Sequence, residues 1–173
     1  MNDREISLKN EVDIISDIYT VDPNNRRIQK EILNKMLETS NILFDETNEI
    51  QNKLNEYFDY LYENGVFDLN RSYNIEIPDL LKIAGFYIDY EPGNTLDRLI
   101  TYISSMKEYL NIELFILINL FSHINEEERR LFSETMISKD IEVLCIESTY
   151  FNGNKSEYEN EEIYILDKDY CEI

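Results

Sequence analysis

The chain has 173 residues, with 36 Asp and Glu against 16 Lys and Arg, so its formal net charge is −20. A hydrophobic fraction of 43%, including 13 Tyr and 8 Phe, is enough for a folded core and argues against a wholly disordered chain. We expect a cytoplasmic protein, because no run approaches the roughly 18 apolar residues of a membrane span, the start lacks a secretory signal, and two cysteines are too few for a disulfide framework.

The beginning of the chain predicts a strand followed by a helix. Residues 12–18 form a short apolar run, typical of a strand, which ends before a turn at 22–24. From that turn to about Leu43, apolar residues recur at helical spacing, and Asp22 or Asn24 is expected to cap the helix.

Two more helices and a strand-like stretch are predicted before the middle of the chain. One helix carries apolar residues at helical spacing over 50–61 and is expected to end near Gly65. The other covers 77–84 and ends at Gly85, and residues 86–88 then read as a short strand.

After a turn at 91–94, helices and strands alternate. A helix is predicted over 96–106, with Asn94 or Thr95 as its cap. The nearly continuous apolar run 112–120 predicts a strand of a parallel sheet that is covered on both faces.

The last third of the chain continues this alternation. Asn125 is expected to cap a helix whose first turn, 126–128, is acidic, as the helix dipole favours. Residues 141–147 and 163–167 predict two further strands. The alternation predicts an α/β fold with a parallel sheet, interrupted earlier in the chain by an inserted helical segment.

The glycines do not support a phosphate-binding loop. Such a loop needs closely spaced glycines before a Lys-Ser/Thr pair, whereas the four glycines here stand apart, at 65, 85, 93 and 153. The central apolar run also carries Asn119 where a nucleotide hydrolase would place a metal-binding acid. We therefore expect neither nucleotide hydrolysis nor a nucleotide cofactor.

Candidate catalytic residues are scarce. His123 is the only histidine and follows a strand end, where α/β proteins place ligands. One hypothesis is a metal-dependent phosphoesterase that uses His123 and nearby acids, and the alternative is a loop histidine without a special role. Cys145 is expected in the core and Cys171 near the terminus.

The net charge argues against nucleic acid, because a basic face is the usual mark of phosphate binding. Charges are screened beyond about 8 Å at physiological salt, however, so a local cluster can outweigh the total. Four bases lie within ten residues on the first predicted helix: Arg26, Arg27, Lys30 and Lys35. They predict either an ordinary polar face or a stripe that contacts phosphates.

Two motifs, one near the middle of the chain and one near its end, point to a known family. They are Leu80-x-Lys82-x-x-Gly85 and the terminal Ile165-Leu166-Asp167-x-Asp169-Tyr170. With these motifs and the order of its elements, the chain resembles the Csn family of type II-A CRISPR adaptation proteins from about Val12 to Ile173. Members carry some tens of residues before this point, so we expect an N-terminally short member or a truncated form.

The resemblance implies an α/β head related to phosphate-loop ATPases but without the phosphate loop, and an inserted α-helical leg. The head is expected to comprise 1–38 and 94–173, and the leg 39–93. The resemblance also implies a homotetrameric ring that holds double-stranded DNA ends in a basic central hole. Such a protein has no enzymatic activity and assists spacer acquisition with the integrase proteins and the RNA-guided nuclease.

The resemblance further implies calcium bound by acids near the hinge of the leg. The matching acids are Glu63, Asp68 and Asp79. Further carboxylate positions of the family are neutral here, namely Asn70, Tyr73 and Asn74. Because fewer carboxylates hold a hard cation less tightly, we expect a weakened calcium site.

Two functions from different classes follow. The leading hypothesis is a non-catalytic protein that binds double-stranded DNA without sequence preference, with phosphate contacts from Arg26, Arg27, Lys30 and Lys35. The alternative is an acidic α/β scaffold that binds a basic protein partner and does not touch DNA.

Overall fold

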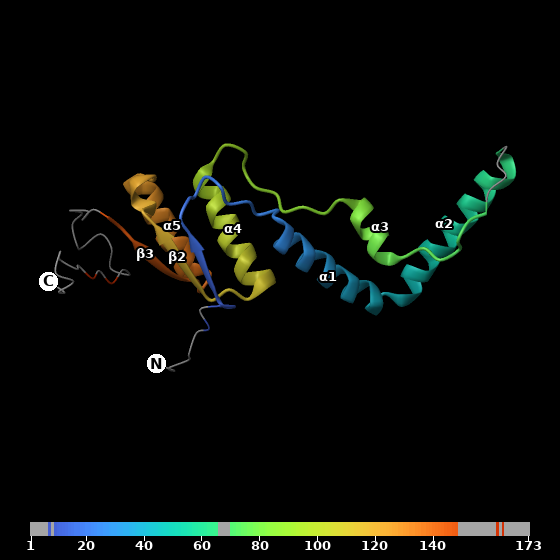
Figure 1. Ribbon diagram of the computed structural model, residues 1–173, viewed down its shortest axis with the longest axis horizontal. Coiled ribbons are helices and arrows are strands. Elements are labelled where there is room, and N and C mark those ends of the chain that lie inside the picture. The colour runs from blue at the N-terminus through green and yellow to red at the C-terminus, as the bar shows by residue number, and fades with distance from the viewer. Residues whose placement is uncertain (1–6, 8, 66–69, 149–161, 163, 165–173) are drawn as a thin grey trace. The chain divides into compact units, whose positions relative to one another are not determined.

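The computed structural model describes residues 7, 9–65, 70–148, 162 and 164 (Figure 1). Except for Tyr164, the strand predicted at 163–167 lies outside these residues, and so does the candidate ligand Asp68. In chain order the elements are β1 (Val12–Ile15), α1 (Arg26–Ile42), α2 (Phe44–Asn64), α3 (Ile77–Ala84), α4 (Thr95–Leu110), β2 (Leu114–Ile118), a 3₁₀ turn (Leu120–Ser122), α5 (Glu126–Ser138) and β3 (Glu142–Ile146). None of the helices in the described ranges combines the length and apolar character that crossing a bilayer requires.

By their internal contacts the residues form two compact units. The first consists of described residues within Met1–Pro23 and Asp89–Ile173 and contains the sheet, α4 and α5. The second is Asn24–Ile88 and contains α1, α2 and α3. The boundaries expected from the family resemblance, with a head of 1–38 and 94–173 and a leg of 39–93, stay a prediction.

The sheet of the first unit confirms the predicted parallel α/β fold. Its order is β1-β2-β3, and both neighbouring pairs are parallel. Residue Ile14 of β1 aligns with Ile116 of β2, which aligns with Leu144 of β3. The first strand therefore joins the sheet from across the helical insertion, as the sequence predicts.

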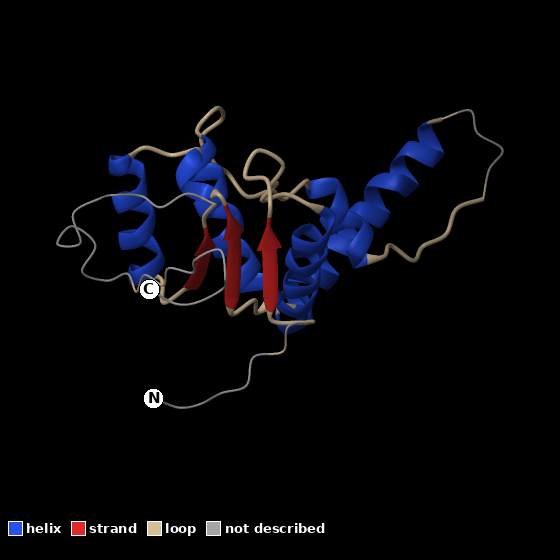
Figure 2. Cartoon of the chain, turned by 60° about the vertical axis from the view of Figure 1, so that its left-hand side comes forward, coloured by secondary structure: helices blue, strands red, loops and turns tan. Residues whose placement is uncertain are grey.

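Only one face of this sheet is covered by described residues, which corrects the prediction of a strand buried on both faces. Phe115 and Leu117 of β2 are fully buried, and α4 and α5 lie on their side of the sheet (Figure 2). On the other face Ile14, Leu144 and Ile146 are 65%, 47% and 49% exposed. An apolar run shows that a strand can be buried, but not how many layers pack on it.

The path of the chain explains why both helices share a face. The connections from β1 to β2 and from β2 to β3 step in the same direction across the sheet. Right-handed crossovers that step in the same direction place their helices on the same side. The core forms there, where Leu99, Ile103 and Met106 of α4 are fully buried beside the buried side chains of β2.

The helix caps follow local side-chain chemistry. Asn94 caps α4 by accepting a hydrogen bond from the amide of Asp97, at 2.9 Å, which confirms one of the two predicted caps. Asn125 caps α5 in a reciprocal capping box with Glu128. The cap of α1 was predicted wrongly, because Asn25 makes the contacts to the first-turn amides and not Asp22 or Asn24.

Asn24 has a different role, which also corrects the strand predicted at 86–88. Those residues are not in a strand. Instead the side chain of Asn24 accepts a hydrogen bond from the amide of Ile88 (2.7 Å) and donates one to its carbonyl (2.8 Å). The side-chain amide of Asn24 thus makes the two hydrogen bonds that a neighbouring strand would make, and it joins the first and last residues of the second unit.

Replacing Asn24 by alanine is expected to cost about 1–3 kcal/mol of unfolding free energy, because both backbone groups of the half-buried Ile88 lose their partner. Urea unfolding measures the loss, and hydrogen exchange of the Ile88 amide should speed up. Asn34→Ala, at an exposed position of α1 in the same unit, is the control and should change little. Unchanged exchange at Ile88 would contradict the role of Asn24.

Candidate functional site

Three of the four candidate DNA-binding bases lie together on α1. Arg26, Arg27 and Lys30 are exposed. At roughly 100° per residue they fall within a sector of about 100°, opposite the buried Ile28 and Ile32. We call these three side chains the basic face of α1.

Lys35 does not share the basic face. It is exposed as well, but it lies on the helix at roughly 130° from the centre of the sector that holds the other three bases. The closeness of the four bases in the sequence therefore overstated how many of them share one side of the helix, because neighbouring residues of a helix point in different directions around its axis.

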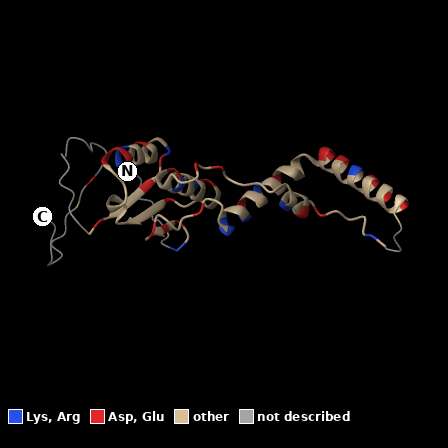
Figure 3. Ribbon diagram, turned by 90° about the horizontal axis from the view of Figure 1, so that it is seen from above, with Lys and Arg blue, Asp and Glu red and all other residues tan. Residues whose placement is uncertain are grey.

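α1 is distinctive in charge among the described helices. It contains four bases and two acids, Glu31 and Glu38, so its formal charge is +2. The adjoining α2 has one base, Lys53, against six acids, and its formal charge is −5. Figure 3 shows the basic residues on α1 and the mainly acidic α2 of the same unit. Local positive potential is therefore concentrated on α1 within a strongly acidic chain.

The position of two of these bases is not explained by helix stability. Arg26 and Arg27 occupy the first turn of α1, which has no acidic residue. The helix dipole makes that end positive, so it favours acids there and disfavours bases. Their charges add to the dipole and create a spot suited to an anionic group.

A polar row on α2 holds the segment that leads to α3. Gln51 donates to the carbonyl of Ile75 at 2.7 Å, and Asn55 donates to the carbonyl of Tyr73 at 3.2 Å. Arg71 donates from two nitrogens to Asp59, at 2.6 and 3.1 Å. Residues 71–75 are thereby attached to α2 and run antiparallel to it.

The spacing of these contacts has a simple geometric reason. Partners on α2 are four residues apart, which is about 6 Å of helix rise, and partners on the segment are two apart, which is about 6.6 Å of extended chain. The two repeats nearly match, so one side of the helix can bond alternate residues of the segment. The signal was visible in the sequence as polar residues at 51, 55 and 59, but it did not show which segment they bind.

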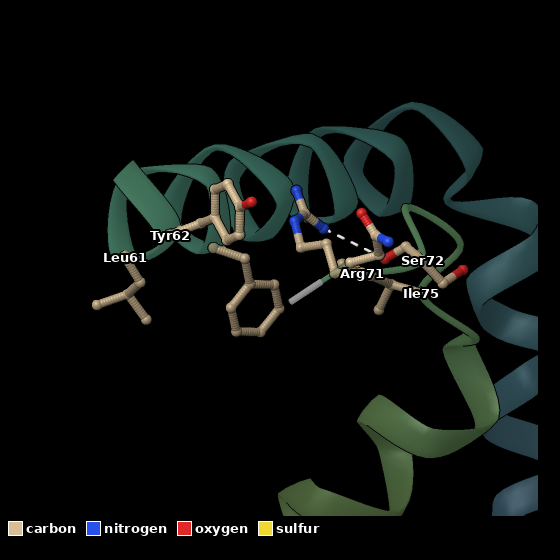
Figure 4. A pocket seen from close by; sticks show the side chains of 7 residues that line it. Leu61, Tyr62, Arg71, Ser72 and Ile75 are labelled. Atoms are coloured by element: carbon tan, nitrogen blue, oxygen red, sulfur yellow. Dashed lines mark hydrogen bonds between the residues drawn. The ribbon is translucent and has the colours of Figure 1, made fainter. Parts of the chain in front are cut away.

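A pocket of about 380 Å³ opens where Arg71 meets α2 (Figure 4). Its lining is formed by Phe58, Leu61, Tyr62, Asn70, Arg71, Ser72 and Ile75. The guanidinium of Arg71 points toward α2 and is already engaged by oxygen atoms, so the polar part of the pocket serves the fold.

The predicted calcium ligands are not brought together in the described part of the chain. Glu63 is exposed in the last turn of α2, and Asp79 in the first turn of α3 forms an ion pair with Lys82 at 2.8 Å. No group of three or more His, Cys, Asp or Glu side chains that could hold a metal occurs among the described residues. Calcium binding stays a prediction, since Asp68 is not described.

The neutral residues near the hinge have other contacts. Tyr73 is exposed and lies under the guanidinium of Arg71, 4.0 Å from the ring centroid. Asn74 is exposed and donates a hydrogen bond to the carboxylate of Glu76. Asn70 is exposed on the rim of the pocket.

The carboxyl ends of the strands hold Asn119 and His123. Asn119 has a left-handed backbone (φ 53°), and its side chain accepts a hydrogen bond from the amide of Ser148 at 2.9 Å, so it joins the loops after β2 and β3. His123 is exposed and meets the ring of Tyr19 edge to face, with centroids 5.4 Å apart. These contacts are structural, and the described geometry gives the phosphoesterase hypothesis no support.

The comparisons with known proteins agree with the sequence motifs. A family model described as CRISPR-associated protein (Cas_Csn2) matches residues 1–170, nearly the whole chain. A search of curated proteins gives no match.

Proposed function

The chain belongs to the Cas_Csn2 family of CRISPR-associated proteins, and from this premise we propose that it is a non-catalytic DNA-binding protein that assists spacer acquisition. Its partners in this role are double-stranded DNA, further copies of itself, the integrase proteins and the RNA-guided nuclease. The family's head related to phosphate-loop ATPases would then serve assembly and not hydrolysis.

The observation that carries the proposal is the basic face of α1. Arg26, Arg27 and Lys30 are exposed on one side of the one described helix with a net positive charge. Because the Debye length is about 8 Å at physiological salt, a phosphate close to this face responds to these bases more than to distant acids. The net charge of −20 is thus compatible with DNA bound at one place.

Contacts of this kind position a duplex but read no sequence. We therefore propose binding that is independent of sequence, and from the family resemblance we propose that it is directed to DNA ends. A mobility-shift assay should show a shift of linear duplex and a weaker shift of closed-circular duplex of the same sequence. Binding should weaken steeply with salt, with a slope of log K against log[salt] near −0.9 for each phosphate contacted. Failure to bind either DNA at low salt, with and without CaCl₂, would contradict the proposal.

The exposed apolar residues of the second unit support self-assembly. Ile42, Phe44 and Ile83 are 82%, 65% and 82% exposed, and no residue of α2 is buried. Large apolar side chains left exposed on a compact unit are candidates for a protein interface. We propose that this surface joins copies of the chain into the homotetrameric ring of the family, for which light scattering should give a tetramer mass. A clean monomer would contradict the ring.

A further inference from the structure

The side chain of Arg71 makes five hydrogen bonds within the second unit. Its Nε and Nη2 donate to Asp59 Oδ1, at 3.1 and 2.6 Å. Nη1 donates to Asn55 Oδ1 at 2.9 Å and to the carbonyl of Ser72 at 3.3 Å, and Nη2 donates to the carbonyl of Asn55 at 2.9 Å. All three nitrogens of the guanidinium are therefore bound to oxygen.

Two aromatic rings lie close to the same group. The guanidinium carbon lies 4.0 Å from the ring centroid of Tyr73 and 5.8 Å from that of Phe58. The side chain is only 22% exposed, and that of Asp59 is 43% exposed. A partly desolvated cation held by a carboxylate and two rings is bound more strongly than an exposed ion pair.

The oxygen atoms around Arg71 are of the kinds that hard metal ions take as ligands. They comprise a carboxylate, a side-chain amide and two backbone carbonyls, which are also typical calcium ligands. Here a covalently attached guanidinium holds the centre of the set. By contrast, of the described acids of the predicted calcium set, Glu63 is exposed and Asp79 is paired with Lys82.

We propose that Arg71 is the built-in cation of the second unit, and that it fastens residues 70–75 to α2 without a divalent metal ion. The segment then keeps its place on α2 at any calcium concentration. Asn55 and Gln51 bind the backbone of the same segment two and four residues beyond Arg71, so the segment is held to α2 at three successive points.

The test uses the full chain and needs no DNA, so its result is independent of the proposed function. Thermal unfolding followed by circular dichroism is measured in EDTA and in excess CaCl₂. Hydrogen exchange of wild-type amides 70–76, measured in the same two buffers, should be equally slow in both. Arg71→Gln should melt about 5 °C or more below the wild type in both, because Asp59 and the carbonyls lose their cation. Lys82→Gln, which breaks only an exposed ion pair in the same unit, should melt like the wild type.

A local measurement covers the case in which Arg71→Gln does not fold. Hydrogen exchange of amides 70–76 should be faster in Arg71→Lys than in the wild type, since lysine keeps the charge but not the planar fork of donors. Two results would overturn the proposal. One is hydrogen exchange of wild-type amides 70–76 that is faster in EDTA than in CaCl₂, and the other is Arg71→Gln with unchanged melting temperature and exchange.

Discussion

Reversing the charges of the basic face, with Arg26→Glu, Arg27→Glu and Lys30→Glu in one protein, is expected to weaken DNA binding roughly a hundredfold or more at physiological salt. In the proposed complex each change removes a base that faces a phosphate and puts a carboxylate in its place, which costs several kcal/mol when charges of like sign meet at close range. The measurement is a titration of labelled linear duplex by mobility shift or anisotropy. The salt slope of any residual binding should fall by about 0.9 for each phosphate that the variant no longer neutralises.

The control carries the same total charge. Lys53→Glu, Lys82→Glu and Lys139→Glu alter three exposed lysines outside α1, and in both triple variants the formal net charge goes from −20 to −26. Only a local basic face predicts that the first variant loses binding while the second keeps most of it. An equal loss in both would mean that net charge alone sets the affinity. If the wild type does not bind DNA at all, the acidic scaffold becomes the better interpretation.

Phe115→Ala is expected to be the most destabilising single change in the first unit, at about 3–5 kcal/mol of unfolding free energy. Phe115 is fully buried on β2, the middle strand of the sheet, so its truncation leaves a cavity between the sheet and the helices that cover it. Typical domains are stable by about 5–15 kcal/mol, so a large share of the stability is lost. Urea or thermal unfolding of the purified variant measures the effect.

The next residue along β2 provides the matched control. The side chain of Ile116 lies on the other face of the sheet, where it is only half-buried and its aligned neighbours Ile14 and Leu144 are exposed. We expect Ile116→Ala to cost less than half as much as Phe115→Ala, because less apolar area returns to water. If the two cost the same, the open face of the sheet is covered in the folded protein.

Most elements could be predicted from the sequence because their signals are local. The helix ended by Gly85 has the predicted bounds, and the structure shows why, since Gly85 takes the left-handed conformation (φ 67°) that ends helices. Asn94 and the acidic first turn of α5 were likewise identified from neighbouring residues. The cap of α1 was missed by one residue, because Asn24 and Asn25 have the same chemistry and only the path of the chain distinguishes them.

The candidate site could be predicted only in part. The bases on α1 are visible in the sequence, but the helix separates Lys35 from the other three. The ion pair between Arg71 and Asp59 was not predicted. The chain has 36 acids, and the sequence does not show which of them lies near Arg71 in the folded protein.

The net charge, the parallel α/β pattern, the helical insertion and the family were determined by the sequence alone. These features depend on composition, on periodicity within one element, or on short motifs. The tertiary structure alone decided which face of the sheet the helices cover. It also decided that Asn24 bonds to Ile88 and that Arg71 holds residues 70–75 on α2. Each of these depends on which distant groups meet when the chain folds, and a linear pattern contains no record of that choice.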